Sequence, residues 1–276
     1  MKKFVALLLA LSMVFCFAAC GSSDEKAPDD TSAKTLKILD TEYANEEYAI
    51  CIAKDNDELL GKVNEALAAL KEDGTAQAIV DKYISGVDHG KTFQADAEGK
   101  EELHMATNAF FPPYEYYEGD AVVGIDIEMA QAIADYLDMK LIVDDMDFDA
   151  ILPAIQSGKA DMGMAGLTVT PTRAESVNFS EPYANGIQVI VVTEDSPITT
   201  VDDLLDPEAD YVAGVQQGTT SDVYLSDSYE NGGITEERVS KFNKSADAIQ
   251  ALLTGKIDCV VVDNEPAKAF LETYNG

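Results

Sequence analysis

LPAIQSGKADMGMAG at residues 152–166 and IQALLTGKIDCVVVD at residues 249–263 are two copies of one pattern. In each copy an apolar helical stretch ends in Ser/Thr-Gly-Lys, and an Asp two residues later precedes a five-residue apolar run typical of a buried strand. The offset is constant, so Asp161 corresponds to Asp258. Parallel α/β sheets bind ligands beyond the carboxyl ends of their strands, so the two units predict two lobes whose strand ends face each other across a cleft.

The rest of the chain alternates between strand-like and helix-like segments. Strands are expected at 36–39 and 48–53, helices at 56–74 and 75–86, and a linker without periodicity at 87–100. This alternation predicts an α/β fold with mainly parallel sheets. Two unrelated βα units could also look alike, but the shared Gly-Lys-x-Asp argues against that alternative.

The composition is that of an acidic globular protein. The 276 residues are 46% hydrophobic, and the formal charge of −32 leaves no Lys/Arg cluster to bind a phosphate backbone. Nucleic acid is therefore not expected as a partner, and the acidity is interpreted as a solvated surface.

The N-terminus has the layout of a secretion signal. MKKFVALLLALSMVFCFAAC (1–20) has two lysines, an apolar run and small residues before Cys20, and FAAC-G resembles the lipobox of bacterial lipoproteins. A signal peptide at 1–19 and lipidation of Cys20 are expected. The acidic stretch that follows, up to residue 34, is interpreted as a tether, which gives an extracytoplasmic protein anchored to the cell membrane by lipid.

Catalytic and metal-binding side chains are scarce. Cys51 and Cys259 lie in apolar runs and are expected to be small core residues, although a disulfide between them stays open. The two histidines, His89 and His104, cannot supply a metal site or a catalytic triad. We therefore expect no catalytic residues, no metal and no cofactor.

Charged and polar groups follow the two repeated strands. Thr168, Thr170 and Arg173 come after the first, and Asp263 ends the second. The planar guanidinium group suits a carboxylate, and Asp263 can accept from an ammonium group, so the pair could clamp a zwitterion. An interlobe salt bridge or two surface charges would explain the same residues.

Five motifs together resemble those of one protein family. TNAFFPPYEY, VGIDIEMAQAIA, MDFDAILPAIQSGKADMGMAGLTVTPTRAESVNFSEPY, VAGVQQGTTSD and GKIDCVVVDNEPA, spread over 101–276, look like the extracellular solute-binding proteins, family 3, that deliver polar amino acids to ABC transporters. The resemblance implies the two-lobed type II periplasmic-binding-protein fold, with two hinge strands that let the lobes close over an amino acid. It also implies an ABC transporter permease as partner.

The resemblance implies a set of ligand-binding residues. The α-carboxylate would be bound by Arg173, Thr168, Thr219 and Thr220, and the α-ammonium by Asp263 and the Gly166 carbonyl. Phe111 and Phe148 match aromatic walls, and Asn108 and Gln216 match positions that read the ligand side chain. Because relatives that bind lysine or arginine tend to have a carboxylate where Asn108 stands, an uncharged ligand such as glutamine is favoured.

The last residues, EPAKAFLETYNG (265–276), end in a turn signal with no strand after it. In the usual order of this family, a strand, a crossover strand and two helices follow, and residues 35–86 resemble that tail. We therefore expect a circular permutation in which Gly276 lies close to Lys34–Leu36. The alternative is that residues 35–86 pack on a neighbouring chain, but the linker is long enough for the intramolecular version, and a monomer is expected.

The permutation sets the expected domain boundaries. Lobe I would comprise residues 48–186, including the linker 87–100, and lobe II residues 34–47 plus 187–276.

The resemblance favours a binding protein over two alternatives. A dehydratase-like enzyme on the same scaffold would need a further acid or base in the cleft, and a sensory domain would normally continue into a membrane segment.

Overall fold

The computed structural model describes residues 34–88, 90–93 and 98–276. The predicted signal peptide, Cys20, the tether up to residue 33, and His89 lie outside the described part. No helix within the described part is long and apolar enough to cross a membrane.

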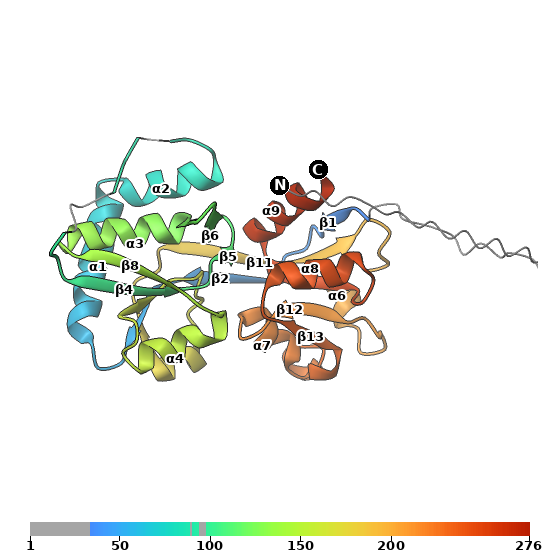
Figure 1. The fold of residues 1–276 in the computed structure, drawn as a ribbon. Coiled ribbons are helices and arrows are strands. Elements are labelled where there is room, and N and C mark those ends of the chain that lie inside the picture. Colours follow the sequence, from blue (N-terminus) through green and yellow to red (C-terminus); the bar gives the residue numbers. More distant parts are fainter. Residues whose placement is uncertain (1–33, 89, 94–97) are drawn as a thin grey trace, which may run out of the picture. The chain divides into compact units, whose positions relative to one another are not determined.

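Two mixed sheets covered by helices form two lobes (Figure 1). The lobe I sheet has the strand order β10 (Val177–Phe179), β3 (Cys51–Ala53), β9 (Met162–Gly163), β4 (Glu102–Thr107), β8 (Lys140–Asp145). A separate small sheet consists of β5 (Phe110–Phe111), β6 (Glu115–Glu118) and β7 (Ala121–Val123), which follow β4 in the sequence. The lobe II sheet has the order β1 (Leu36–Ile38), β11 (Ala184–Thr193), β14 (Cys259–Asp263), β12 (Ala213–Gln216), β13 (Val239–Phe242), and β2 (Ala44–Tyr48) also pairs with β11.

Helices cover both sheets, as an α/β fold requires. Those of lobe I are α1 (Asp57–Glu72), α2 (Thr75–Ile84), α3 (Ile125–Tyr136), α4 (Ile151–Gln156) and α5 (Pro171–Ser176), with the 3₁₀ turn η1 (Phe148–Ala150). Those of lobe II are α6 (Val201–Leu205), α7 (Thr220–Ser226), α8 (Ser245–Leu253) and α9 (Asn264–Asn275), with the 3₁₀ turns η2 (Tyr229–Asn231) and η3 (Glu236–Arg238). Asn56 caps α1, since its Oδ1 accepts from the Leu59 N–H at 3.1 Å.

The prediction of mainly parallel sheets is wrong. In each lobe only three neighbouring strands are parallel, β8-β4-β9 and β13-β12-β14, and the remaining pairs are antiparallel. Every antiparallel pair of the two lobe sheets includes β11, which passes between the lobes, or β3, which follows the crossover strand β2, so no crossover helix forces these strands to run parallel to their neighbours.

Two expected strands are also shorter than predicted. The segment 48–53 is split into β2 and β3 because the chain leaves one sheet and enters the other there. In the first repeat only Met162 and Gly163 of the five-residue run are paired, whereas all five residues of β14 are strand.

The repeat has the same hydrogen bonds in both lobes. Asp161 Oδ2 accepts from the His104 N–H at 2.8 Å, and Asp258 Oδ2 accepts from the Val212 N–H at 2.8 Å. In return the N–H of each Asp donates to the carbonyl of the same partner at 2.9 Å. Each Asp therefore binds the backbone near the start of the central parallel strand of its lobe, β4 or β12. This shared role gives a physical reason for the same spacing between Gly-Lys and Asp in both copies of the repeat.

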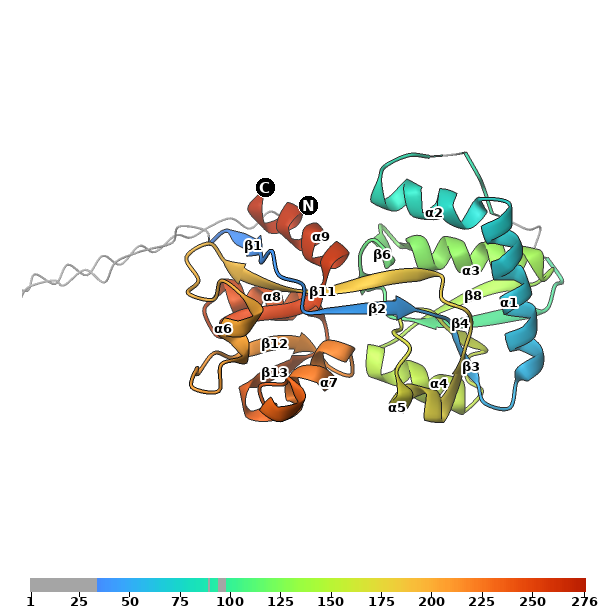
Figure 2. The same cartoon turned by 180° about the vertical axis from the view of Figure 1, so that it is seen from behind.

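Two crossover strands connect the lobes (Figure 2). β2 and β11 pair antiparallel from Ala184 opposite Tyr48 to Gln188 opposite Ala44. Tyr48 packs flat against Gly186, where a Cβ atom would lie 2.1 Å from the phenolic oxygen. Only glycine therefore fits at position 186.

Each lobe has its own apolar core. Cys51 is buried in lobe I and Cys259 in lobe II, and both thiols are free, which confirms the expectation of small core residues and leaves no disulfide between them.

The end of α9 lies beside β1 in both views (Figures 1 and 2). Asn275 Oδ1 accepts from the Leu36 N–H at 2.9 Å, and Asn275 Nδ2 donates to the Leu36 carbonyl at 2.8 Å. The expected proximity of the last residues to Lys34–Leu36 is therefore confirmed, within one lobe.

We expect Asn275→Ala to lower the free energy of unfolding by about 1–2 kcal/mol, because it removes two partly buried hydrogen bonds to the backbone of β1. Urea denaturation measures the change. Glu272→Ala, on the exposed side of the same helix, is the control and should stay within about 0.5 kcal/mol of the parent. Equal stability of the two variants would show that the bonds to Leu36 do not stabilise the fold.

Candidate functional site

All ten residues expected to bind ligand line one small cavity. The cavity lies at the carboxyl ends of four strands: Asn108 follows β4, Gly166 comes shortly after β9, Gln216 ends β12 and Asp263 ends β14. The other predicted residues that line it are Phe111, Phe148, Thr168, Arg173, Thr219 and Thr220. Three residues that were not predicted complete the wall, namely Glu46, Glu115 and Ala165.

Arg173 is held in place by backbone carbonyls. Thr170 caps α5 by accepting from the Arg173 N–H at 3.2 Å, which fixes the base of the side chain. Nη1 donates to the Thr168 carbonyl at 2.9 Å, and Nη2 donates to the Gly218 carbonyl of lobe II at 3.1 Å. The guanidinium carbon lies 5.5 Å from the centre of the Phe148 ring. Burial lowers the pKa of Arg173 below its ordinary value.

Asn108 and Gln216 bind each other across the cavity. Gln216 Nε2 donates to Asn108 Oδ1 at 2.9 Å and to the Asn243 carbonyl at 3.1 Å, while Gln216 Oε1 accepts from the Ser245 hydroxyl at 3.0 Å. Asn108 Nδ2 donates to the Met146 carbonyl at 2.7 Å. Both amides therefore have protein partners in this closed arrangement.

Asp263 is a half-buried carboxyl that lines the cavity at the end of β14. The Tyr48 hydroxyl donates to its Oδ1. Burial raises the pKa of Asp263 from its ordinary value to about 7, and the nearby Glu46 carboxylate adds to the effect. Asp263 therefore gains or loses its charge near neutral pH.

Glu115 and Asp126 form a second buried acidic group. Asp126 Oδ2 accepts from the Gly166 N–H at 3.0 Å and from the Tyr183 hydroxyl at 2.7 Å, so it orients the peptide between Ala165 and Gly166. Among the described residues, the other oxygen of Asp126 and both oxygens of Glu115 have no hydrogen-bond partner apart from the contact between the two carboxyl groups. Burial raises the pKa of both groups, that of Asp126 to about 6, and that of Glu115 is raised further by Asp126. The pair is expected to hold a proton at neutral pH.

Phe111 packs against Gly166. Gly166 has φ +55°, and a Cβ atom there would lie 2.7 Å from Cε1 of Phe111. Phe111 also stacks on Tyr114, with ring centres 5.6 Å apart. The aromatic wall on this side therefore depends on glycine at 166.

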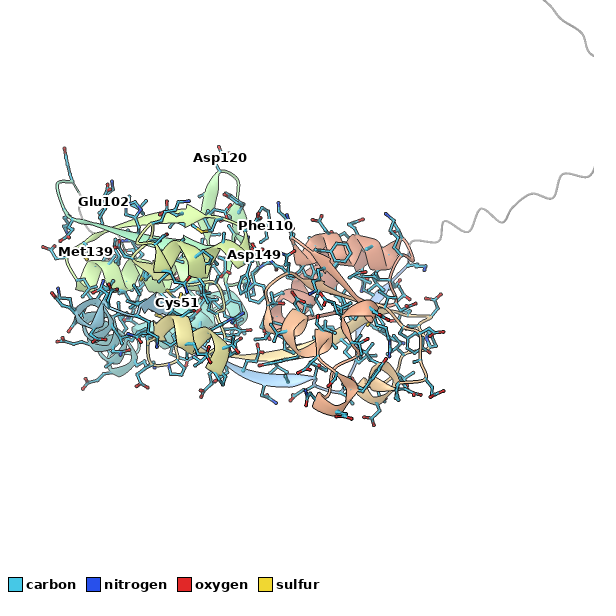
Figure 3. All side chains as sticks on the ribbon, turned by 90° about the horizontal axis from the view of Figure 1, so that it is seen from below. Cys51, Glu102, Phe110, Asp120, Met139 and Asp149 are labelled. Carbon is cyan, nitrogen blue, oxygen red and sulfur yellow. The ribbon has the colours of Figure 1, made fainter. Side chains whose placement is uncertain are left out.

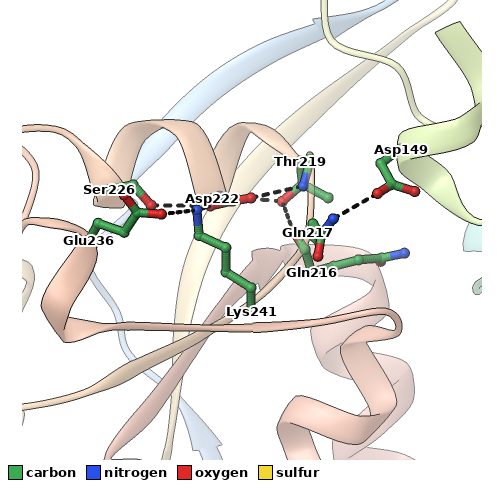
Figure 4. A network of polar contacts seen from close by, with 9 residues as sticks. Asp149, Gln216, Gln217, Thr219, Asp222, Ser226, Glu236 and Lys241 are labelled. Carbon is green, nitrogen blue, oxygen red and sulfur yellow. Dashed lines mark hydrogen bonds and ion pairs between the residues drawn. The ribbon is translucent and has the colours of Figure 1, made fainter. Parts of the chain in front are cut away.

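The turn between β12 and α7 is held by its own side chains (Figure 4). The Thr219 hydroxyl donates to the Gln216 carbonyl at 2.8 Å and accepts from the Asp222 N–H at 3.4 Å, as a helix cap does. Asp222 Oδ2 accepts from the Gly218 N–H at 2.9 Å, and Lys241 Nζ lies 3.1 Å from Asp222 Oδ1. In this state the hydroxyl proton of Thr219 is used within the turn.

Two contacts at the edge of the cavity join the lobes. Gln217 Nε2 donates to Asp149 Oδ2 at 2.7 Å (Figure 4), and Lys244 Nζ lies 3.4 Å from the centre of the Phe110 ring. Figure 3 shows Phe110 and Asp149 on the side of lobe I that faces lobe II. The structure therefore represents a closed state.

The sequence reasoning did not find Glu46 and Glu115. A signal for Glu46 exists, because in β2 the exposed Asn45 and Glu47 alternate with buried Glu46 and Tyr48, so the period places an acidic residue on the inner face. Across residues 34–88, 90–93 and 98–276, no group of three or more His, Cys, Asp or Glu is placed to hold a metal ion.

The chain is similar to a family of known proteins. Residues 103–245 match the family model described as bacterial extracellular solute-binding proteins, family 3. The chain is 32% identical over 185 residues to the arginine-binding extracellular protein ArtP of Bacillus subtilis (strain 168), which covers 67% of this chain and 69% of the relative.

Two solved structures are also similar. An ancestral arginine-binding protein bound to glutamine has a TM-score of 0.56 and 38% identity, covering 63% of this chain and 74% of that one. An ancestral amino acid-binding protein that is a precursor of cyclohexadienyl dehydratase has a TM-score of 0.56 and 31% identity, covering 62% of this chain and 74% of that one.

We expect Gly166→Ala to lower the free energy of unfolding by about 2–4 kcal/mol, because the new Cβ atom adds a clash with Phe111 to the strain of a positive φ. Gly158→Ala is the matched control, since Gly158 has φ +70° and open space around its Cβ position, and should cost about 1 kcal/mol. Thermal or urea unfolding separates the two. Equal losses would mean that Phe111 moves aside freely.

Proposed function

We propose that this chain, which belongs to the bacterial extracellular solute-binding proteins of family 3, captures a polar α-amino acid between its lobes and delivers it to the permease of an ABC importer. The family places it outside the cytoplasm as a solute-binding protein and not an enzyme. The observation that carries the proposal is the single cavity in which a guanidinium group and a carboxylate, Arg173 and Asp263, come from opposite lobes.

The charges around the cavity support a zwitterionic ligand. Arg173 is half-buried and already oriented by two carbonyls, so it can receive a carboxylate with little loss of side-chain entropy. Asp263 and the Gly166 carbonyl accept from an ammonium group. Phe111 and Phe148 would pack against the carbon chain between the two ends.

The ligand side chain is the finer part of the proposal. The neutral pair of Asn108 and Gln216 favours glutamine, and the two amides would exchange their mutual hydrogen bond for bonds to a ligand amide. Arginine is the second candidate, for two reasons. The relative from Bacillus subtilis is named for arginine, and Glu46 and Glu115 add acidic groups to a cavity whose wall contains one cation, Arg173.

The mechanism follows from where the groups lie. The amino acid first binds lobe I through Arg173, Thr168 and the aromatic side chains, and rotation about β2 and β11 then brings Asp263 and Thr220 across the cavity. The contacts between Asp149 and Gln217 and between Phe110 and Lys244 form only in this closed state. The permease would recognise that state.

We also propose the circular permutation, with the lobe boundaries expected from the sequence, lobe I at 48–186 and lobe II at 34–47 plus 187–276. Support comes from the pairing of β1 with β11 and from the bonds between Asn275 and Leu36. The family match begins at residue 103, so residues 35–86 lie before it. A monomer, lipid-anchored through Cys20 and with its tether entering lobe II, completes this description.

We expect isothermal titration with a panel of amino acids to show 1:1 binding, with glutamine and arginine as the discriminating pair. Arg173→Ala should weaken binding by on the order of a hundredfold or more, because the ligand carboxylate would lose its charged donor. Lys159→Ala removes one exposed positive charge of lobe I outside the cavity and should bind like the parent. If Arg173→Ala binds as tightly as the parent, the carboxylate assignment is wrong.

A reordered chain tests the permutation: it starts at Glu101, runs to Gly276 and continues directly into residues 34–86. We expect this chain to fold and to bind the same ligand with an affinity within about threefold of the parent, because domain ends that lie together tolerate a moved chain break. Titration and sedimentation measure affinity and mass. A reordered chain that binds only as a dimer would favour the swapped arrangement, and one that fails to fold would count against the permutation.

A further inference from the structure

Glu46 is a buried carboxylate whose role the ligand clamp does not explain. It lies on the crossover strand β2, is 5% exposed and lines the cavity. Its Oε1 has no hydrogen-bond partner within the described part of the chain. A buried carboxylate oxygen without a donor costs free energy, so a donor is expected to reach it in the loaded state.

The two side chains that donate hydrogen bonds to Glu46 both donate to its other carboxylate oxygen. Oε2 accepts from the Thr168 hydroxyl at 2.8 Å and from Gln188 Nε2 at 3.1 Å. The orientation of the Gln188 amide is fixed, because its Oε1 already accepts from the Ser221 hydroxyl. The carboxylate is therefore fixed, with Oε1 left for a partner that the chain itself does not supply.

The bond to Glu46 also decides what Thr168 can do. Since the Thr168 hydroxyl gives its proton to Glu46, its oxygen can only accept on the cavity side. Arg173 is close enough to Glu46 that the carboxylate partly offsets the lowering of the Arg173 pKa by burial, but Nη1 and Nη2 donate to carbonyls and leave Glu46 Oε1 without a donor among the described residues.

We infer that Glu46 is a second anionic partner of the ligand ammonium, which sets the specificity of the site for a primary ammonium with three N–H donors. The acceptors around it would be Glu46 Oε1, the Asp263 carboxylate and Thr168 Oγ1, with the Gly166 carbonyl close by in the wall. This inference rests on the proposed function and moves the Thr168 side chain from the carboxylate end, where the sequence placed it, to the ammonium end.

The place of Glu46 on β2 couples ammonium binding to the hinge. Asp263 belongs to lobe II and Thr168 to lobe I, and Glu46 stands on the strand that joins them. An ammonium group that binds all three therefore links both lobes and the crossover, which favours the closed state.

The pH dependence of binding gives a signature of this arrangement. Asp263 must be charged to pair with an ammonium, and burial together with Glu46 raises its pKa to about 7. Affinity should therefore fall as the pH decreases through about 7, by nearly tenfold per pH unit at most. The ionisable groups that face or act on this carboxyl are Glu46 and Tyr48 from β2, Tyr114 and Glu115 near β6, and Arg173 from α5. Among these groups, Glu46 raises the pKa of Asp263 the most, second only to burial. Removing the Glu46 charge should therefore move the midpoint of the pH dependence of binding to lower pH.

The test is titration calorimetry of the parent, Glu46→Gln and Glu47→Gln at pH 5.5, 6.5, 7.5 and 8.5. The probes are L-glutamine and L-arginine, each with its Nα-methyl and Nα,Nα-dimethyl derivative. At pH 8.5 we expect Glu46→Gln to weaken binding by about ten- to a hundredfold, as for loss of a charged hydrogen bond, and to shift the pH midpoint downward. Glu47→Gln removes the same charge from the exposed side of the same strand and should match the parent in both respects.

The parent alone gives a second measurement that needs no variant. Each methyl group removes one N–H donor, so the inference expects affinity to fall at each step. Equal affinity of the parent for the primary and dimethyl compounds would overturn the inference. A Glu46→Gln variant with parental affinity and an unshifted midpoint would also overturn it. If the parent binds none of the amino acids, the proposed function fails first, and the two failures are thereby distinguished.

Discussion

The antiparallel pairing of β2 with β11 is the constraint on which the rest of the molecule depends. These strands connect the two lobes, and their register places the Tyr48 ring on Gly186 and its hydroxyl on Asp263. The same strand directs Glu46 into the cavity, and β11 contributes Gln188, which fixes the Glu46 carboxylate. Hinge and binding site are thus built from the same residues, so a change in lobe angle must change the acceptors that a ligand meets.

The cavity is dominated by acidic groups that the protein only partly neutralises. Glu46, Glu115 and Asp263 line it together with one cation, Arg173, and burial raises the pKa of both Asp263 and Glu115. Such an arrangement is costly in the empty protein, and a ligand that brings positive charge and N–H donors relieves the cost. Affinity would then come from satisfying preformed acceptors as much as from apolar burial.

Part of the site could be predicted from the pattern of strands alone. Gly166 and Asp263 end the two repeated runs, and the carboxyl ends of parallel strands meet at one edge of a sheet. Asn108 and Gln216, which also lie at strand ends, were implied by the resemblance to the family. The equivalent bonds of Asp161 and Asp258 give the 97-residue repeat a physical reason. Glu46 was not predicted as a site residue because it lies in the middle of a strand, in a stretch whose other acidic residues indicate a solvent-exposed edge.

The sequence by itself determined the α/β class, the two repeated units and the polar residues that end their strands, since these follow from local periodicity and short spacing. The proximity of the last residues to β1 was implied by the resemblance to the family's order of elements. Only the tertiary structure decided the strand directions, because every antiparallel pair of the two lobe sheets includes β11 or β3, whose directions depend on the passage of the chain between lobes. It also decided which donors and acceptors are already taken. The pairing of Asn108 with Gln216, the use of the Thr168 proton by Glu46 and the raised pKa of Asp263 all join residues more than a hundred positions apart, and burial and hydrogen bonding at that range cannot be read from spacing.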